Sequence, residues 1–363
     1  MDSMKLEDCC EILDSQRVPI TGSDRTSGDY PYYGANGIQD YVDDFIFDDE
    51  LVLLAEDGGN FGSKTRPIAY RVSGKCWVNN HAHVLKPKAG LDVDYLCYSL
   101  MFYDVGGMVN GATRQKLTQA AMRQMIIPKR SLDEQIEIVN IIKKVQGVIA
   151  SRKEELEQLD LLIKARFVEL FGDININDKN WKYEPLGELC TIVRGGSPRP
   201  IEQFLGGDVP WIKIGDATDG DSIYLNSTKE HIIQEGIKKS RLVKEGSLIF
   251  ANCGVSLGFA RIITFDGCIH DGWLAMEDID ERLDKVFLLQ ALNQMTEHFR
   301  AIAPAGTQPN LNTAIMKAYK QVIPPIELQR EFINFAKQVT KSKVAVQKAL
   351  DETQILFDSL MQE

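Results

Sequence analysis

The longest regular pattern in the sequence is an apolar heptad along residues 132–171. Side chains in two columns repeat every seven positions, and arginine replaces an apolar residue twice in one of them. The columns consist of Ile142, Ile149, Leu156, Ile163 and Leu170, and of Ile138, Val145, Arg152, Leu159 and Arg166. Gly147 is the only helix-breaking residue, and no proline or turn cluster interrupts the stretch. A heptad sustained over this length predicts one long coiled-coil helix.

The same heptad returns near the end of the chain. Gln135 corresponds to Gln329, which lies 194 residues later, and the apolar columns continue at that offset. The identical residue pairs at this offset include Gln135/Gln329, Asn140/Asn334, Lys143/Lys337, Val145/Val339, Leu156/Leu350 and Leu162/Leu356. A fixed offset with a shared heptad indicates an internal repeat.

The repeat extends into the segments that precede the two helices. In both segments an apolar run leads into a glycine-rich turn, LVLLAEDGG from Leu51 and LIFANCG from Leu248. Short β-branched and aromatic runs alternate with a few helical stretches, so we predict α+β domains. The predicted order is a globular domain at 1–130, a helix at 131–171, a linker at 172–182, a second globular domain at 183–324 and a helix at 325–363.

Composition and charge restrict the possible partners only weakly. The 363 residues carry a formal net charge of −11, which taken alone argues against nucleic acid, because phosphates attract cations. The distribution of charge matters more than its sum, however. The seven cysteines show no CxxC spacing, and there is neither a signal-peptide pattern nor an apolar run long enough for a membrane span. We therefore expect a cytoplasmic protein with reduced thiols.

The sequence contains none of the common catalytic signatures. The glycine-rich nucleotide loops and the HExxH motif of zinc proteases are absent. His81 and His83 lie two apart on a predicted strand, but no third ligand is patterned with them, so we expect no metal site. A repeated module of this kind on a long helix is better interpreted as a device that binds two similar things a fixed distance apart.

Residues able to read bases or hold phosphates gather in the predicted turns. Arg, Lys, Asn and Gln contact base edges and phosphates, and glycine lets a backbone approach a ligand closely. In the first domain the candidates are Tyr33, Asn36, Asn60, Lys64, Asn79, Asn80, His81, Arg114 and Lys116. In the second domain they are Arg194, Ser197, Arg199, Lys213, Lys238, Lys239, Arg241, Asn252, Gln308 and Asn310. For each residue alone, the alternative is an ordinary turn residue or surface cation.

Seven segments carry a resemblance to a known family. In the first half they are YPYYGANGIQDYV, LLAEDGGNFG and WVNNHAHVLKP. In the second half they are GGSPRP, VPWIKIGDAT, GIKKSRLVKEGSLIFA and IPPIELQREF. Over nearly its whole length the chain resembles the specificity subunit of type I restriction–modification systems. It departs from that family at residues 127–138 (IPKRSLDEQIEI), where the family usually has two prolines before the Glu-Gln pair.

The resemblance implies two pseudo-symmetric target recognition domains, each of which reads one part of a split DNA sequence. It implies that the two long helices pack antiparallel and fix the gap between the parts. It also implies a subunit without catalysis and without a cofactor of its own. The expected partners are double-stranded DNA, two modification subunits that methylate adenine with S-adenosylmethionine, and restriction subunits that cut DNA with ATP and Mg²⁺.

Two other classes of protein stay open on the sequence alone. One is a structural adaptor whose coiled coil brings proteins together without touching DNA. The other is a restriction or methylation polypeptide whose motifs are lost or hidden. DNA binding in the presence of a methyltransferase partner would exclude the adaptor, and methyl transfer by the isolated chain would favour the enzyme.

Overall fold

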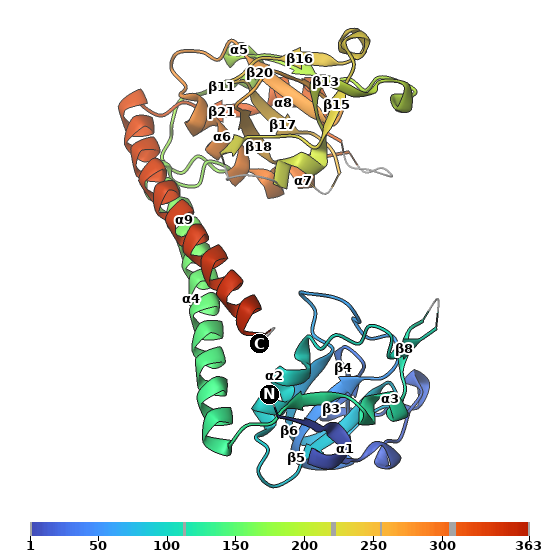
Figure 1. The fold of residues 1–363 in the computed structure, drawn as a ribbon. Helices are drawn as coiled ribbons and strands as arrows, with labels where there is room; N and C mark the ends of the chain where they lie inside the picture. Colours follow the sequence, from blue (N-terminus) through green and yellow to red (C-terminus); the bar gives the residue numbers. More distant parts are fainter. Residues whose placement is uncertain (1, 112–113, 219–222, 255, 305–309, 362–363) are drawn as a thin grey trace. The chain divides into compact units, whose positions relative to one another are not determined.

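The computed structural model describes residues 2–111, 114–218, 223–254, 256–304 and 310–361 (Figure 1). The chain divides into two compact units, which we describe separately. Unit 1 is Met1–Glu154 with Gln347–Glu363, and unit 2 is Glu155–Val346. Among the described residues, no helix is both long and apolar enough to cross a membrane.

Unit 1 is built on a six-stranded sheet with the strand order β2-β7-β5-β6-β3-β4. Adjacent strands in this sheet pair antiparallel, except β3 and β6, which pair parallel. The strands are β2 (Cys10–Ile12), β3 (Ser27–Gly34), β4 (Gly37–Val42), β5 (Phe47–Ala55), β6 (Ala69–Val78) and β7 (Ala82–Pro87). Strand β5 is buried on both faces: Val52 and Leu54 join one core cluster, and Leu51 and Leu53 join another. Because successive strand side chains point to opposite faces, burial on both sides explains the continuous apolar run.

Short elements cover this sheet. Helix α2 (Val93–Met101) packs Leu96 and Leu100 into the cluster that contains Val52. The remaining elements of unit 1 are β1 (Ser3–Lys5), α1 (Leu6–Cys9), η1 (Asp14–Gln16), η2 (Gly22–Asp24), β8 (Val109–Asn110), β9 (Lys116–Leu117), α3 (Gln119–Arg123) and β10 (Ile126–Pro128).

Unit 2 has two larger sheets. One has the order β12-β20-β17-β18-β14 and the other the order β15-β13-β19-β16. Their strands are β12 (Thr191–Arg194), β13 (Leu205–Ile212), β14 (Tyr224–Leu225), β15 (Glu230–Ile232), β16 (Arg241–Val243), β17 (Leu248–Ala251), β18 (Ala260–Ile263), β19 (Gly267–Ile269) and β20 (Trp273–Glu277). The other elements are β11 (Tyr183–Pro185), α5 (Leu186–Leu189), η3 (Ile201–Gln203), η4 (Ile214–Thr218), η5 (Gln234–Lys239), α6 (Lys285–Gln294), α7 (Thr296–Ile302), α8 (Thr313–Ala318) and β21 (Lys320–Val322).

Both units share one frame, as the internal repeat predicts. The first strand of each globular part pairs antiparallel with the strand that precedes its long helix, β1 with β10 and β11 with β21. A one-turn helix follows each first strand, and its first residue, Leu6 or Leu186, is completely buried. The predicted α+β class and two-domain architecture are therefore confirmed. The predicted domain boundaries along the sequence stay a prediction, because the two units each include parts of both long helices.

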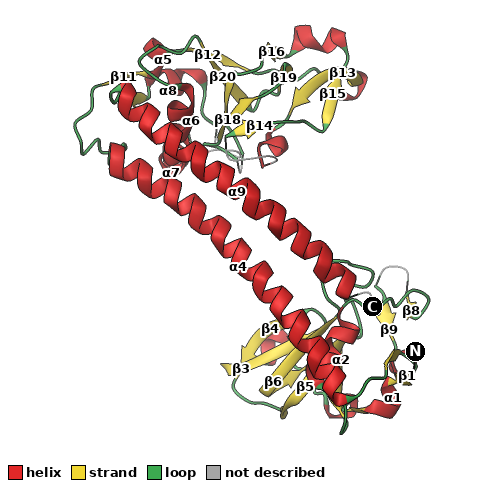
Figure 2. Ribbon diagram, turned by 60° about the vertical axis from the view of Figure 1, so that its left-hand side comes forward, coloured by secondary structure: helices red, strands yellow, loops and turns green. Residues whose placement is uncertain are grey.

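The two long helices are α4 (Leu132–Phe171) and α9 (Ile326–Leu360). Every residue of the two predicted columns in α4 is buried or half-buried, whereas intervening residues such as Lys164 are exposed. In unit 2 the helices run antiparallel and side by side (Figure 2). There the Arg166 guanidinium lies 2.6 Å from the Glu331 carboxylate, and Lys343 Nζ lies 2.6 Å from Asp160 Oδ1. The apolar face of the heptad is the face that the helix buries.

Helix α4 begins with a capping box in place of the two prolines usual in the resembled family. The Ser131 N–H donates to Glu134 Oε2 at 2.8 Å, and the Glu134 N–H donates to Ser131 Oγ at 3.4 Å. Two N–H groups at the helix start are satisfied in this way. The hydrogen bonds from Ser131 also hold the pKa of Glu134 below its usual value. This reciprocal contact explains how residues 127–138 begin a helix without a second proline.

A buried glutamine ties each long helix to its globular part. Gln135 Oε1 accepts the backbone N–H of Asp92 at 2.8 Å, and its Nε2 donates to the carbonyls of Gly90 and Arg130, each at 3.0 Å. Both Gln135 and Gln329 are completely buried.

The contacts of Gln329 in unit 2 repeat those of Gln135. Gln329 Oε1 accepts the N–H of Asp284 at 2.8 Å, and Nε2 donates to the carbonyls of Arg282 at 2.8 Å and Pro324 at 2.7 Å. Asp284 is the N-cap of α6, as Asp92 is of α2. One polar contact therefore recurs at the same place in both copies.

We predict that Gln135→Leu and Gln329→Leu each lower the free energy of unfolding by about 2–4 kcal/mol. Leucine has a similar size but leaves three backbone groups without a partner, and an unsatisfied buried polar group costs about 1–3 kcal/mol. Urea denaturation of the full chain measures the effect. The exposed Gln158 provides the control. If the Gln135→Leu variant is as stable as the Gln158→Leu variant, the buried contact contributes nothing to the free energy of unfolding.

Candidate DNA interface

In unit 1, four of the predicted residues line one cavity of about 400 Å³. They are Asn79, Asn80, His81 and Arg114. The first three form the turn between β6 and β7, where the Asn79 Oδ1 accepts the N–H of His81 at 2.7 Å. The Asn79 amide also donates to Gln39 Oε1 at 3.0 Å, which ties the turn to β4. Asn79 is buried and shapes this turn, while Asn80 and His81 present their side chains to the cavity side.

Two predicted cations of unit 1 project from the end of the loop before α3. Arg114 Nε lies 2.7 Å from Asp57 Oδ1, and Lys116 Nζ lies 3.0 Å from Glu56 Oε1. Both cationic side chains are exposed, at 59% and 50%, although their carboxylate partners are largely buried. The end of β5 therefore anchors the cations while their remaining N–H groups stay accessible to a ligand.

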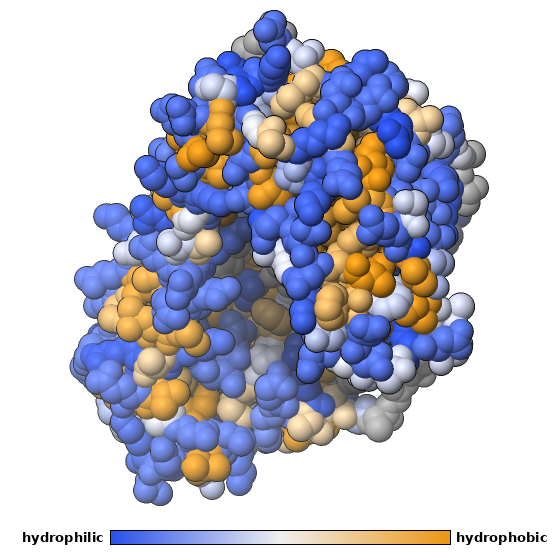
Figure 3. Space-filling model, turned by 90° about the horizontal axis from the view of Figure 1, so that it is seen from below, coloured by the Kyte–Doolittle hydropathy of each residue, from blue (hydrophilic) through white to orange (hydrophobic). Residues whose placement is uncertain are grey.

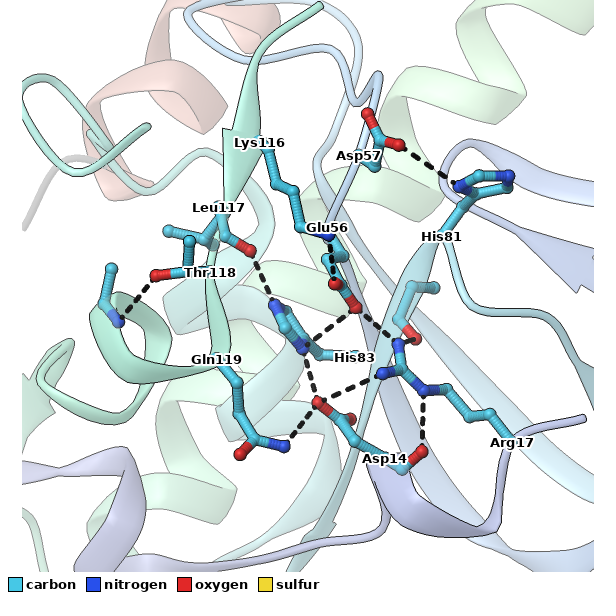
Figure 4. A network of polar contacts seen from close by, with 12 residues as sticks. Asp14, Arg17, Glu56, Asp57, His81, His83, Lys116, Leu117, Thr118 and Gln119 are labelled. Atoms are coloured by element: carbon cyan, nitrogen blue, oxygen red, sulfur yellow. Dashed lines mark hydrogen bonds and ion pairs between the residues drawn. The ribbon is translucent and has the colours of Figure 1, made fainter. Parts of the chain in front are cut away.

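A buried polar network lies behind this loop (Figure 4). His83 of β7 is completely buried, its Nδ1 lies 2.7 Å from Asp14 Oδ2, and its Nε2 donates to the Leu117 carbonyl at 2.9 Å. Gln119 Nε2 donates to the same Asp14 oxygen at 2.9 Å. Burial raises the pKa of Asp14, but the hydrogen bonds, led by that from His83, outweigh burial and lower it overall. An ionised Asp14 thus fixes His83, and His83 fixes the strand that carries Lys116.

Asp14, Glu56 and His83 each place a potential metal ligand within 4.8 Å of the others. A metal would need their lone pairs, but the Arg17 guanidinium already lies 2.6 Å from Glu56 Oε2 and 3.6 Å from Asp14 Oδ2. His83 Nε2 must carry a proton, because its partner is a carbonyl, which only accepts. The donor set therefore fits an ion-pair network and not a metal centre.

In unit 2, three of the predicted residues line a cavity of about 300 Å³. They are Ser197, Arg199 and Lys213. Ser197 Oγ donates to Asp271 Oδ1 at 2.9 Å, which fixes the loop after β12. Lys213 forms an ion pair with Glu230, and its ammonium lies 5.7 Å from the ring centroid of the buried Trp211. The cation Lys213 and the aromatic Trp211 thus line the same cavity.

In unit 2, Asn252 and Asn310 hold the loop that corresponds to the loop of Glu56 and Lys116 in unit 1. The Leu311 N–H donates to the Asn252 carbonyl at 2.8 Å, just as the Leu117 N–H donates to the Glu56 carbonyl at 2.7 Å. The Asn252 amide donates to Asn310 Oδ1 at 3.1 Å and to the Leu311 carbonyl at 3.0 Å. Because Asn252 is completely buried, it holds this loop and does not present its side chain to DNA, contrary to the expectation from sequence.

The other predicted residues do not line these two cavities. The Asn36 amide donates to the Gly58 carbonyl at 3.1 Å, and Tyr33 packs against Tyr70. Arg194 Nε donates to the Asp271 carbonyl at 3.0 Å. Asn60 is half-buried, and Lys64, Lys238, Lys239 and Arg241 are exposed. Gln308 lies outside the described residues.

Sequence reasoning missed several polar residues that line the cavities. In unit 1 they include Arg25, whose guanidinium lies 4.1 Å from the Tyr32 ring centroid, and Gln39. In unit 2 they include Glu230 and His270. Burial lowers the pKa of His270, and nearby cations act in the same direction against the opposing effect of Asp271. Arg25 and Gln39 flank the aromatic segment at residues 30–33, which was the available signal.

Comparison with known proteins defines the class of this chain. A sequence profile described as the type I restriction modification DNA specificity domain matches residues 1–161 and 178–353. A putative type I restriction enzyme specificity subunit of Haemophilus influenzae is 30% identical over 342 residues, which cover 91% of this chain and 85% of the relative. The MjaIX specificity subunit of Methanocaldococcus jannaschii is 23% identical over 327 residues, or 81% and 74% of the two chains.

Solved structures with a similar fold belong to the same kind of system. The S subunit of a type I restriction–modification system from M. genitalium aligns with a TM-score of 0.57 at 15% identity, over 99% of this chain and 94% of that one. A chain from a study of complex assembly and conformational transition of the type I system aligns with a TM-score of 0.66 at 15% identity, over 99% and 96%. At this identity the likeness shows the fold.

The duplicated fold with a cation-bearing cavity in each half defines a recognition subunit made of two similar modules. This chain belongs to the family of type I restriction–modification specificity subunits. It is a non-catalytic subunit that recognises a DNA sequence for its restriction–modification system and forms a complex with the other subunits of that system. The fold, function and lack of catalysis implied by the resemblance are thereby confirmed, and the adaptor alternative is not favoured.

We predict that Lys238→Ala combined with Lys239→Ala weakens DNA binding by a similar factor for all sequences. Both lysines are exposed in the last turn of η5, where cations contact phosphates without reading bases. The slope of log affinity against log salt should fall by up to about 2, with little change in melting temperature. Fluorescence anisotropy at several salt concentrations measures both quantities.

A matched control removes two exposed lysines of α9, Lys341 and Lys348, by alanine substitution. It changes the net charge equally but should leave the salt slope unaltered. Normal DNA binding by the Lys238/Lys239 variant, accompanied by a large loss of thermal stability, would assign these lysines to folding.

Proposed function

We propose that each unit reads one half of the DNA target through the loops around its cavity. The observation that supports this most directly is the convergence of candidates from separate turns, His81 with Arg114 in unit 1 and Arg199 with Lys213 in unit 2. Arginine and asparagine make bidentate contacts to base edges, and lysine neutralises phosphates. The contacting residues are thus expected among the cavity-lining side chains and the exposed lysines.

The acidic net charge is compatible with this assignment. Five acidic side chains fall within residues 43–50, a stretch that leads from β4 into β5. None of these five lines the unit 1 cavity, whose charged members are Arg25 and Arg114. Charge is therefore unevenly distributed along unit 1, and the local sign at a phosphate matters more than the total.

We also propose that α4 and α9 act as a ruler for the gap between the two half-sites. Support comes from the buried contacts of Gln135 and Gln329, which attach each helix to a globular part through three hydrogen bonds. When a helix is attached in this way, its length, at ~1.5 Å per residue, sets the distance between the parts fixed to its two ends.

Two modification subunits are the proposed partners, bound at equivalent faces of the duplicated helices. The support is a pair of exposed apolar dipeptides related by the offset of 194, Leu161-Leu162 and Ile355-Leu356. Exposed aliphatic pairs on charged helices are typical of partner contacts. In this assignment S-adenosylmethionine, ATP and Mg²⁺ belong to the partner subunits, this chain binds none of them, and the assembly acts in the cytoplasm.

We predict that exchanging residues 1–128 for the segment of another family member changes one half of the recognised sequence only. Each unit has its own core clusters, so a new cavity in unit 1 leaves that of unit 2 intact. Genome-wide mapping of methylated adenines in cells that express the hybrid gives the outcome. The matched exchange of residues 183–324 should change the other half. A change of both halves after either exchange would contradict modular reading.

We predict that one extra heptad in both helices, after Glu155 and after Ala349, changes the recognised gap. Seven residues keep the apolar columns in register and lengthen each helix by ~10 Å at ~1.5 Å per residue. The increment matches about three base pairs at ~3.4 Å each. It also corresponds to about a third of a turn at ~10–10.5 pairs per turn. The variant should methylate a longer gap or lose the bipartite site.

Insertion of only four residues at the same two points is the control, because it breaks the heptad and should impair folding. Methylation assays on substrates with gaps of different length measure the result. If the heptad variant folds, assembles with its partners and still methylates only sites with the original gap, the helices are not a ruler. Their role would then be limited to binding the partner subunits.

A further inference from the structure

Strand β4 of unit 1 carries a β-bulge at Gln39. Tyr32 of β3 pairs with Asp40, whereas the next residue of β3, Tyr33, pairs with Ile38. Gln39 is therefore the extra residue between two paired positions. A bulge takes one residue out of the regular ladder and redirects its side chain, and bulges are common beside functional sites. Here the redirected side chain lines the cavity of the candidate DNA interface.

The buried Asn79 fixes the orientation of the Gln39 amide. The backbone N–H of His81 can only donate, so the Asn79 atom that lies 2.7 Å from it is the oxygen Oδ1. The Asn79 nitrogen Nδ2 is then the atom that donates to Gln39 at 3.0 Å, and the Gln39 atom that accepts is the oxygen Oε1. Asn79 is 3% exposed, and reversal of its amide would break both of these hydrogen bonds.

The backbone of β3 supports the same amide from a second side. A Cβ atom at Gly34 of β3 would collide with Gln39 Nε2, so the glycine lets the amide lie directly against the strand. Exposed polar side chains are ordinary in this protein, since the face seen in Figure 3 is mostly hydrophilic, with separate apolar patches in orange. Gln39 is exposed as well, but two neighbours hold its amide in one orientation.

The oriented amide of Gln39 has unused hydrogen-bonding capacity. An amide oxygen accepts two hydrogen bonds and an amide nitrogen donates two. Among the residues that the structure describes, Asn79 is the only hydrogen-bond partner of the Gln39 side chain. Oε1 therefore keeps one lone pair and Nε2 keeps both protons. An acceptor and a donor stand side by side at the cavity, in an order that the fold determines.

We propose that Gln39 is a specificity-determining residue that reads one adenine in the half-site of unit 1. Adenine presents its N7 acceptor and its N6 donor side by side in the major groove, and a glutamine amide matches both at once. Guanine presents acceptors at N7 and O6, so its O6 would face the Gln39 oxygen with no proton between them. The inference rests on the proposed reading of one half-site by the loops of unit 1.

The charges around Gln39 suit the approach of DNA. Arg25 and Arg114 line the same cavity and supply positive charge for phosphates. The adjacent Asp40 is acidic, but its Oδ2 lies 3.2 Å from Arg25 Nη1, which offsets the negative charge. Arg25 in turn lies over the Tyr32 ring, with 4.1 Å between the guanidinium carbon and the ring centroid. A base-reading amide and phosphate-binding cations thus share one cavity.

Selection from random DNA duplexes tests the proposal. The full-length chain is assembled with its modification subunits, and the bound duplexes are sequenced. The wild-type assembly should prefer an A·T pair at one position of the unit 1 half-site by about tenfold or more. Gln39→Ala should abolish the preference at that position. Gln39→Glu should shift the preference to a C·G pair, because a carboxylate accepts from cytosine N4. Preferences at all other positions should stay the same.

Gly34→Ala tests the orientation of the amide while Gln39 itself is kept. The added methyl group displaces the end of a flexible side chain, so this variant should weaken the same preference and no other. Gln16→Glu is the matched control, because Gln16 is exposed in η1, lies outside the cavity and gains the same charge as Gln39→Glu. It should leave every base preference unaltered. Melting curves show whether each variant is folded.

Unchanged base preferences in the folded Gln39→Ala and Gln39→Glu variants would overturn the inference. An equal loss of affinity for all sequences, together with a lower melting temperature, would assign Gln39 to the folding of β3 and β4 and would also overturn it. The exchange of residues 1–128 separates this inference from the proposed function. If that exchange changes neither half-site, reading by unit 1 is wrong. If it changes one half-site and the Gln39 variants change nothing, only the role of Gln39 is wrong.

Discussion

In each unit one buried carboxamide satisfies three backbone groups where the long helix meets the globular part. Gln135 and Gln329 make the same set of hydrogen bonds, to the N-cap of the adjacent helix, to the loop before that cap and to the loop before the long helix. An amide that rotates away would leave buried donors and acceptors unpaired. The direction of the long helix relative to α2 or α6 is therefore restricted, and through those helices it is tied to the sheet that carries the cavity loops.

The helical part of this architecture could be predicted from the sequence because it is local. The heptad columns, the offset of 194 and the matching glutamines are all visible as spacing. The role of the glutamines was not visible, since Gln135 bonds to Gly90 and Gln329 to Arg282, partners that only the tertiary fold brings near. The same reason explains why one six-stranded sheet in unit 1 and two larger sheets in unit 2 were not predicted. Strand pairing joins distant segments whose spacing carries no signal.

The sequence indicated which turns carry the candidate residues more reliably than it indicated where each individual side chain lies. Turn composition directed attention to Asn80, Arg114 and Arg199, which the structure places in the lining of the two cavities, and their contact with DNA stays a prediction. Asn252 has the right chemistry but lies in the core, because the loop after β17 folds over it. His81 and His83 were expected to share one strand face. Strand β7 begins at Ala82, so His81 belongs to the turn and only His83 enters the sheet. Alternation along a strand does not apply across that boundary.

Unit 2 is one continuous stretch, Glu155–Val346, whereas unit 1 combines Met1–Glu154 with Gln347–Glu363. On a ribosome, which delivers the chain from the amino end, the residues of the continuous unit are all present before those of the discontinuous unit are all present. Ile142 and Ile149 of α4 are buried in the complete protein, and they are synthesised long before the residues of α9 that belong to the same unit. The apolar side chains of α4 that belong to unit 1 must therefore stay protected through most of the synthesis of the chain. The unit whose synthesis begins first is completed last.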